Sequence, residues 1–340
     1  MDPVLAALER AAENGLMPRG ATVLLAVSGG ADSLALLFGC VEASRRTGWR
    51  LAVGHVHHGW RRREADRDLS FVADHARRLG LPFFHRRCDA GRAAAELGLS
   101  PEAGARHVRY EALGELAKEA GASRIATAHQ RDDAVESYLL ALERRGGLSR
   151  RAGPRARRED GVVRPLLAVG RGAILAFLAE RGLRFRRDAT NGDLALSRNR
   201  VRRRLAGVND ADRAALAEEV SALARERERL DDEFARRVAP AIRREDDAAS
   251  VDARILADCS DELLRLVLSR LAGPLARAGR PPMTGRERER IVARLRSGED
   301  FRFEAGRRIC FERRRGRLRI RLRSSKGAGP VYDSAQRIPV

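Results

Sequence analysis

The sequence predicts an α/β fold: a doubly wound parallel sheet, followed by a helical connector and a smaller α+β domain. Short apolar segments alternate with helical patterns over the first half of the 340 residues, which is typical of a parallel sheet. A glycine-rich turn separates the first apolar segment from the first helical one. The last third of the chain carries two helical patterns and then short alternating strands, which indicate a second domain.

The first strand is expected at residues 23–27, because a continuous run of valine and leucine suits a strand that is buried on both faces of a sheet. Apolar residues then recur at helical spacing from Leu34 to Val41. Further pairs of a strand and a helix follow. We expect their strands at 51–56, 82–87 and 124–128, and their helices at 64–79, 101–120 and 132–142.

The chain beyond these pairs has a different character. Residues 146–161 have almost no apolar content and are expected to form a mobile basic loop. Residues 209–238 form a long, highly charged helical pattern, which we interpret as a solvated connector. Other helices are expected at 174–183, 197–205, 261–271 and 285–295, and a strand is expected at 317–322.

The charge of the chain points to a polyanionic partner. Lysine and arginine total 67 against 47 aspartates and glutamates, a formal net charge of +20. A positive field of this kind attracts nucleic acids and displaces counterions from their phosphates. A bias in codon usage is the alternative, since Lys118 and Lys326 are the only lysines. Such a bias explains arginine in place of lysine, but it does not explain the excess of cations.

The cysteines and the apolar runs indicate the cellular compartment in which the protein is expected. The cysteines show no Cys-x-x-Cys spacing, so neither a zinc site nor a disulfide framework is indicated, and a reducing cytoplasm is the natural setting. The N-terminal residues include acids, and no apolar run approaches membrane-spanning length, so neither secretion nor membrane insertion is expected. The cysteines are Cys40, Cys88, Cys259 and Cys310.

The turn after the first strand reads Ser-Gly-Gly-Ala-Asp-Ser. Its glycines let the backbone approach a ligand, and the next helix presents free N–H groups at its positive end, so the turn is a candidate phosphate cradle. It is neither the Walker turn, which ends in Gly-Lys-Ser/Thr, nor the three-glycine dinucleotide turn. The alternative is an ordinary helix cap by Ser28 or Asp32. The candidate residues are Ser28, Gly29, Gly30, Ala31, Asp32 and Ser33.

Two carboxylates follow the fourth expected strand. Asp133 and Glu136 lie three apart in the first turn of a helix and therefore share one face. Carboxylates aimed at a phosphate site would repel it unless a divalent cation lay between them, and oxygen-ligated Mg²⁺ is the expected ion. Taken alone, such a pair is usually a solvated helix face. Its position after a strand of the same sheet favours a functional role.

Three histidines end the second expected strand. A metal trio is one interpretation. Strand-end packing combined with substrate contacts is favoured, because His55 and His57 point to one side of a strand and His58 to the other.

Two arginine-rich stretches are candidates for RNA contact. Arg106, Arg109 and Tyr110 lie within one helical turn, and guanidinium forks suit phosphate while a tyrosine ring suits stacking on a base. An ordinary basic helix face is an almost equal alternative. Residues 184–205 crowd arginines among Asp, Thr, Asn and Ser, which favours a folded RNA-binding surface over a solvated charged face.

In combination these stretches resemble one family, the tRNA(Ile)-lysidine synthetases of the PP-loop ATP pyrophosphatase superfamily. The segment 146–161 is a loose version of the family's glycine-rich segment, and the additional C-terminal domain of longer members is not expected here. The family's motifs occur in order across residues 22–205. They are the SGGxDS loop, a histidine-glycine-arginine segment at 55–61, the RxxRY helix, HxxDDxxE at 129–136, RPLL at 164–167, and DxTN followed by RNxVR at 188–202.

The resemblance implies that ATP adenylates the wobble cytidine of tRNA(Ile) with a CAU anticodon, and that free L-lysine then displaces AMP to form lysidine. It implies catalytic roles for Asp32 and Asp133, which would also hold Mg²⁺. ATP would contact the turn from Ser28 to Ser33 and also His55. Lysine would contact Arg109, His129, Asp132 and Glu136, and the tRNA would contact Arg106, Tyr110, Arg198 and Arg202.

The implied domains are a PP-loop ATP-binding catalytic domain at 1–205, a helical connector at 206–245, a small tRNA-binding domain at 246–325 and a tail at 326–340. A homodimer is left open. A tRNA thiolation enzyme is the alternative among enzymes, and it would favour paired cysteines. A basic RNA-binding protein without catalysis is the alternative of another class, and it would favour loss of Asp32, Asp133 or Glu136. The scattered cysteines and the three acids argue against both.

Overall fold

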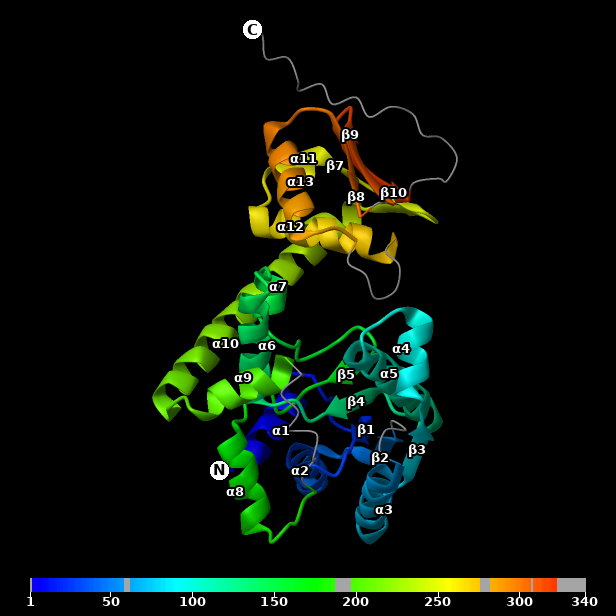
Figure 1. Cartoon of the computed structure of the whole chain (residues 1–340), viewed down its shortest axis with the longest axis vertical. Helices are drawn as coiled ribbons and strands as arrows, with labels where there is room; N and C mark the ends of the chain where they lie inside the picture. The colour runs from blue at the N-terminus through cyan, green and yellow to red at the C-terminus, as the bar shows by residue number, and fades with distance from the viewer. Residues whose placement is uncertain (1, 58–61, 187–196, 276–281, 307, 323–340) are drawn as a thin grey trace. The chain divides into compact units, whose positions relative to one another are not determined.

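The computed structural model describes residues 2–57, 62–186, 197–275, 282–306 and 308–322 (Figure 1). It contains two compact units, Met1–Glu228 and Arg229–Val340. Within the described residues, no helix has both the length and the apolar character needed to cross a membrane. The domain boundaries expected at 205, 245 and 325 remain predictions.

The first unit is built on a five-stranded parallel sheet. Its strand order is β3-β2-β1-β4-β5, and every neighbouring pair is parallel. The parallel α/β fold predicted from the sequence is therefore confirmed. The strands are β1 (Thr22–Ala26), β2 (Arg50–His57), β3 (Phe83–Arg87), β4 (Arg124–Thr127) and β5 (Val162–Val163).

Helices cover both faces of this sheet, which is what makes it doubly wound. Val23 and Leu25 of β1 pack in one apolar cluster, and Leu24, which points the other way, packs in another. The first cluster draws on α1 (Pro3–Glu13), α2 (Ala31–Thr47), α3 (Arg62–Arg78) and α8 (Arg171–Glu180), and the second on α5 (Pro101–Glu119).

The observed helices agree with the predicted ones along most of the first unit. Helix α1 and helix α4 (Ala90–Leu97) were not predicted, and neither was the two-residue strand β5. The remaining helices of this unit include α6 (Arg131–Glu143), α7 (Leu148–Arg151) and α9 (Ser197–Ala206).

The segment 146–161 is not the bare loop that was predicted. It contains α7, and Ala152 after that helix is buried. Its later part hydrogen-bonds beside β5, where the N–H of Arg158 donates to the carbonyl of Val162 over 2.8 Å. The prediction was wrong because backbone hydrogen bonds, rather than apolar side chains, hold this segment in place.

The long charged helix α10 (Asp210–Glu233) is not simply a solvated connector. Its residues Ala217 and Val220 are buried in an apolar cluster with Val135 of α6 and Val201 of α9. The prediction was wrong because a few apolar residues, spaced along a charged helix, are sufficient to bury one stripe of it.

The second unit is a smaller α+β unit, as predicted. Its sheet has the order β6-β7-β10-β9-β8, and all of its pairs are antiparallel. Its helices are α11 (Ala253–Ala257), α12 (Asp261–Ala272) and α13 (Gly285–Ser297). Its strands are β6 (Arg243–Glu245), β7 (Ala248–Asp252), β8 (Phe301–Ala305), β9 (Ile309–Arg314) and β10 (Arg317–Leu322).

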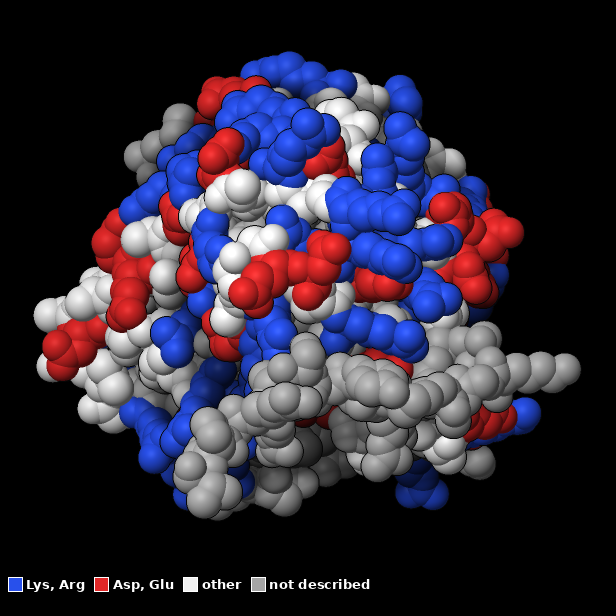
Figure 2. Space-filling model, turned by 90° about the horizontal axis from the view of Figure 1, so that it is seen from above, with Lys and Arg blue, Asp and Glu red and all other residues white. Residues whose placement is uncertain are grey.

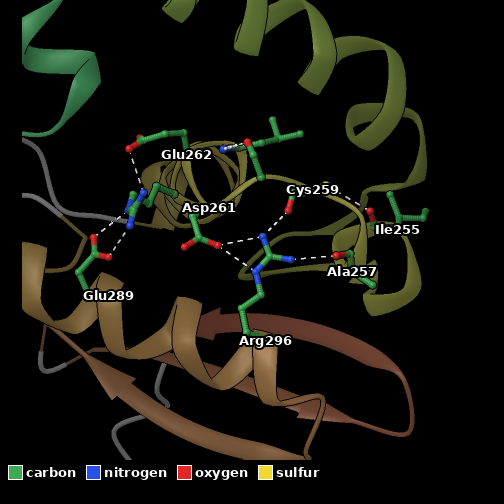
Figure 3. Close-up of polar contacts among 10 residues, drawn as sticks. Ile255, Ala257, Cys259, Asp261, Glu262, Glu289 and Arg296 are labelled. Atoms are coloured by element: carbon green, nitrogen blue, oxygen red, sulfur yellow. Dashed lines mark hydrogen bonds and ion pairs between the residues drawn. The ribbon is translucent and has the colours of Figure 1, made fainter.

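Arginine side chains tie the helices of the second unit together (Figure 3). Arg296 of α13 donates to a carboxylate oxygen of Asp261 over 2.9 Å and to the carbonyl of Ala257 over 2.9 Å. The same guanidinium also donates to the carbonyl of Cys259. One arginine thus joins α13 to the end of α11 and to the start of α12.

Candidate functional site

The site lies at the carboxyl edge of the parallel sheet, because the turns after neighbouring strands meet there. Strand β1 pairs directly with β4, with Ala26 opposite Thr127. Helix α2 begins a few residues after β1, and α6 begins a few residues after β4. The glycine turn and the HxxDDxxE segment therefore stand side by side.

The glycine turn is organised around one hydroxyl group. The Oγ atom of Ser33 accepts from the backbone N–H of Ser28 and from that of Gly29, each over 3.2 Å, and it donates to the carbonyl of Gly30 over 2.9 Å. Gly29 has a φ of +92°, which L side chains rarely adopt. Gly30 is the N-cap of α2 and supplies no side-chain cap, so neither Ser28 nor Asp32 caps this helix.

Asp32 is largely buried beside this turn, and its side chain is 31% exposed. The pKa of its carboxyl group is raised to about 6, mainly by burial; Arg171 opposes the shift and the nearby Asp133 adds to it. Arg171 lies 3.8 Å from Oδ2 of Asp32. The other oxygen, Oδ1, is buried and has no hydrogen-bond partner among the described residues.

Asp133 is held at the start of α6 by a capping box. Its Oδ2 atom accepts from the N–H of Gln130 over 3.0 Å, while the Gln130 side chain accepts from the N–H of Asp132 over 2.8 Å. Its other oxygen, Oδ1, lies 3.6 Å from Arg202 of α9. The carboxylate is therefore held at the edge of the sheet that also carries Asp32.

Glu136 is buried one turn further along α6. The Nε atom of Arg202 donates to its Oε1 atom over 2.7 Å. Arg202 thus contacts both Asp133 and Glu136, and it also opposes the rise in the pKa of Asp32. Three carboxylates and one guanidinium are gathered beside the glycine turn, whereas the sequence suggested that Arg202 belonged to an RNA-binding surface.

Asp132 takes a different partner from its neighbour in the sequence. Its carboxylate lies 3.5 Å from the guanidinium of Arg213 in α10. Asp132 and Asp133 are therefore held by different helices, although the sequence pairs them in one motif.

The histidines of β2 are buried at the same edge. The Nδ1 atom of His55 lies 2.8 Å from the carbonyl of Val27, and burial lowers the pKa of His55. His57 lies 3.4 Å from Asp66 of α3. His58 lies outside the described residues. Among the residues that the structure describes, no group of three or more His, Cys, Asp or Glu is placed to hold a metal, and the histidine trio stays untested because it includes His58.

Arg164, which the sequence singled out only as part of a motif, joins Tyr110 to His129. Arg164 is buried, and its Nη2 atom donates to the hydroxyl of Tyr110 over 3.1 Å. Its Nε atom lies 3.3 Å from Nδ1 of His129. Arg106 and Arg109 lie over the ring of Tyr110, with guanidinium carbons 5.0 and 5.4 Å from the ring centre.

Sequence reasoning missed two other contacts at this edge. Arg171 begins α8 and pairs with Asp32, and nothing in the local sequence indicates this pairing. Arg213 is one of many arginines in a charged helix, so its contact with Asp132 could not be singled out. The side chain of Arg198, a predicted tRNA contact, lies outside the described residues.

Curated relatives share this part of the chain. A tRNA(Ile)-lysidine synthase from Thermus thermophilus is 46% identical over 180 residues, which cover 53% of this chain and 34% of the relative. One from Chlorobaculum tepidum is 39% identical over 198 residues, covering 58% of this chain and 60% of the relative. The matched region thus spans less than two thirds of the length of either relative.

A solved structure and a family model agree with the fold. The U34-tRNA thiolase NcsA from Methanococcus maripaludis superposes with a TM-score of 0.52 and 14% identity, over 65% of this chain and 78% of that one, which is a likeness of fold alone. A PP-loop domain model of an ATP-binding family matches residues 5–208. With more than half of its length matched, and with the glycine turn at the edge of a parallel sheet, the chain belongs to the PP-loop domain family.

Proposed function

We propose that the protein is a tRNA(Ile)-lysidine synthetase, a ligase that joins L-lysine to the wobble cytidine of a tRNA with a CAU anticodon. The observation that carries this proposal is the group of carboxylates from Asp32, Asp133 and Glu136 beside the glycine turn. A nucleotide, a cation and an amine can all be held at such a place. The similarity to lysidine synthases over the same residues supports this choice among PP-loop functions.

In this proposal the turn from Ser28 to Ser33 holds the phosphates of ATP. The N–H groups of the first turn of α2, which have no acceptor within the helix, would donate to the phosphates, and the positive end of the helix favours an anion. His55 stays neutral near neutral pH, because burial lowers its pKa, and it would contact ATP without adding charge.

Two of these carboxylates fit a divalent cation that is shared with the phosphates of ATP. Oδ1 of Asp32 is buried and has no hydrogen-bond partner among the described residues, and Asp133 supplies further oxygen atoms nearby. Oxygen ligands of this type are those that Mg²⁺ prefers. Bound there, Mg²⁺ would neutralise charge on the phosphates as pyrophosphate departs.

The proposed chemistry has two displacements and needs no protein nucleophile. The carbonyl oxygen of the cytosine ring attacks the α-phosphorus of ATP, and pyrophosphate leaves. An amine of lysine then attacks the ring carbon that carries the adenylate, and AMP leaves with the oxygen. The carboxylate of Glu136 would hold the lysine amine and receive its proton, taking the place of part of the Arg202 contact. Arg109, His129 and Asp132 remain proposed lysine contacts.

The second unit is proposed to bind the body of the tRNA. Arg302, Arg319 and Arg321 are exposed on its sheet. The face of the molecule in Figure 2 carries groups of Lys and Arg side chains with Asp and Glu between them. A cytoplasmic location would follow from a tRNA substrate, and assembly as a homodimer stays a prediction of the sequence alone.

Thiolation of tRNA is less well supported than lysidine formation. Cys40 is buried in the core, and burial raises the pKa of its thiol and those of Cys88 and Cys259. A reactive cysteine needs a lowered pKa and access to solvent. These three cysteines therefore lack the features of an activated thiolate.

The products of ATP test the proposed reaction. With labelled ATP, we expect AMP and pyrophosphate to accumulate only when L-lysine and tRNA(Ile) are both present. The Asp133→Asn variant keeps the size of the side chain, and it should release both AMP and pyrophosphate much more slowly than the wild type. Accumulation of ADP, or release of AMP that does not depend on the RNA, would contradict the proposal.

A further inference from the structure

Tyr110 stands at the centre of a cluster of arginines, which we call the Tyr110 cluster: Arg106, Arg109, Arg158 and Arg164 around Tyr110. The guanidinium carbon of Arg158 is 4.3 Å from the ring centre, and those of Arg106 and Arg109 are 5.0 and 5.4 Å from it. The fourth arginine, Arg164, donates to the hydroxyl group.

Three separate parts of the chain build the cluster. Arg106, Arg109 and Tyr110 come from α5 and lie three and four residues apart, so they share one helix face. Arg158 comes from the segment that hydrogen-bonds beside β5, and Arg164 follows that strand directly. The backbone N–H of Arg158 is held by the carbonyl of Val162. Its guanidinium donates twice to Asp160, from Nε to Oδ1 over 3.0 Å and from Nη2 to Oδ2 over 2.7 Å.

The cluster concentrates positive charge. The pKa of Arg106 is lowered, first by burial and then by Arg109, Arg164 and Arg158, while the Tyr110 oxygen acts in the opposite direction. Like charges at close range repel one another, and an aromatic ring offsets this only in part. Asp160 offsets the charge of Arg158, and a further anion would offset the repulsion among the other guanidinium groups.

Tyr110 does not offer an open ring for stacking on a base, which is the role that the sequence suggested. Three guanidinium groups already lie over the ring, so a stacked base would compete with them. The ring instead holds the guanidinium groups in position. Guanidinium forks present paired N–H donors that match phosphate oxygens.

We propose that the Tyr110 cluster binds, through Arg106, Arg158 and Arg164, a backbone phosphate of the RNA strand that carries the reacting cytidine; this inference rests on the proposed tRNA substrate. Arg164 links the cluster through His129 to the end of β4, from which α6 and its carboxylates begin. In this proposal the RNA strand contacts the cluster through a phosphate while its base reaches the carboxylates. The carboxylate of free lysine has the same oxyanion chemistry, and the experiment separates these two sources.

The test measures RNA binding alone, without ATP or lysine. The probe is an RNA hairpin that carries the CAU anticodon loop, and its affinity for the full chain is measured by fluorescence anisotropy between about 50 and 200 mM salt. For the Arg106→Gln/Arg158→Gln double variant, we expect affinity to fall about tenfold. We also expect the slope of log affinity against log salt to become shallower by about 0.7 for each phosphate that the variant no longer neutralises.

The control variants separate the cluster from a general effect of charge and from misfolding. Arg92→Gln removes one charge from an exposed arginine of α4 that pairs with Glu96, and a second control, Arg92→Gln/Arg77→Gln, removes as many charges as the test variant. Both controls should change affinity and slope much less. Tyr110→Leu, which removes the ring, should resemble the double variant, and Tyr110→Phe, which keeps it, should stay near wild type. The thermal unfolding of every variant is measured first, and only variants that unfold like the wild type are compared.

Two results would overturn the inference. One is a double variant whose salt slope equals that of the two-charge control. The other is an unchanged RNA affinity combined with a raised KM for lysine, which would assign the cluster to the lysine carboxylate. Failure of the proposed ligase reaction would leave the RNA measurement standing, because binding is measured without turnover.

Discussion

The Nε atom of Arg202 donates to Oε1 of Glu136 over 2.7 Å, so a guanidinium of α9 neutralises a buried carboxylate of α6. The proposed reaction places the lysine amine at this carboxylate. The cation already present and the substrate cation therefore compete for one acid. Hydrogen bonds between charged groups contribute about 1.5–3 kcal/mol, which is enough to shape the affinity for lysine.

Glu136→Gln should weaken lysine binding more than ATP binding. The amide keeps the size of the side chain but removes the charge, so we expect the KM for lysine to rise about 10- to 100-fold, which corresponds to an interaction of about 1.5–3 kcal/mol. The KM for ATP should change little. Steady-state kinetics with each substrate varied in turn provides the measurement, and equal effects on both substrates would remove Glu136 from the lysine site.

Asp32→Asn should stabilise the folded chain at neutral pH while it abolishes turnover. The pKa of Asp32 is raised from 3.8 to about 6 in the folded chain. As pH rises, the unfolded chain therefore loses this proton before the folded chain does. The free energy of unfolding falls between these two pKa values. With allowance for partial exposure, the substitution should gain about 1–2 kcal/mol above pH 6 and nothing below about pH 4.

Chemical denaturation in a buffer with a chelator, at several pH values, measures this difference. A gain in stability that is the same at low and at neutral pH would show that the carboxylate is not destabilised by its burial.

Gly29→Ala should impair both folding and ATP turnover. A methyl group at this position would lie 3.3 Å from the ring of Phe71, on a backbone whose φ of +92° already disfavours alanine. We expect a loss of about 1–3 kcal/mol in stability. Gly80→Ala is the matched control, because Gly80 also has a positive φ, of +65°, but has open space around it. Thermal unfolding should place the control nearer to wild type, and only Gly29→Ala should lose activity.

Replacing all four cysteines should leave the chemical step intact. The proposed reaction uses an amine and no thiol, whereas a persulfide or disulfide relay would need an activated thiolate. The replacement of Cys40, which is packed in the core, should cost about 1 kcal/mol in stability. Lysine incorporation by the folded cysteine-free variant is the measurement. Loss of this step while ATP and tRNA still bind would favour thiolation.

The sequence was most informative where local pattern and burial coincide. Strand β1 was predicted within one residue because its valine and leucine run is buried on both sides. Strand β5 has only two residues and carries no such pattern. Segment 146–161 was misjudged for a related reason, since its order comes from hydrogen bonds to a strand that the sequence does not reveal.

Part of the candidate site could likewise be predicted from the sequence, and part of it could not. The glycine turn and the acids of α6 could be placed together, because parallel strands end at a common edge. The partners of Arg202 and Tyr110 could not be predicted, because an arginine-rich chain offers many cations for each acid and each ring. Only the folded structure shows which ones meet.

The most direct test of the proposed reaction is the fate of labelled L-lysine. The protein is incubated with ATP, labelled lysine and a tRNA(Ile) transcript, and the RNA is digested and analysed by mass spectrometry. We predict that the wobble cytidine gains the mass of lysine less one water, that this gain requires ATP, and that a transcript with uridine at the wobble position stays unlabelled. An unmodified cytidine in the presence of folded protein, ATP and lysine, or a gain of sulfur in its place, would contradict lysidine formation.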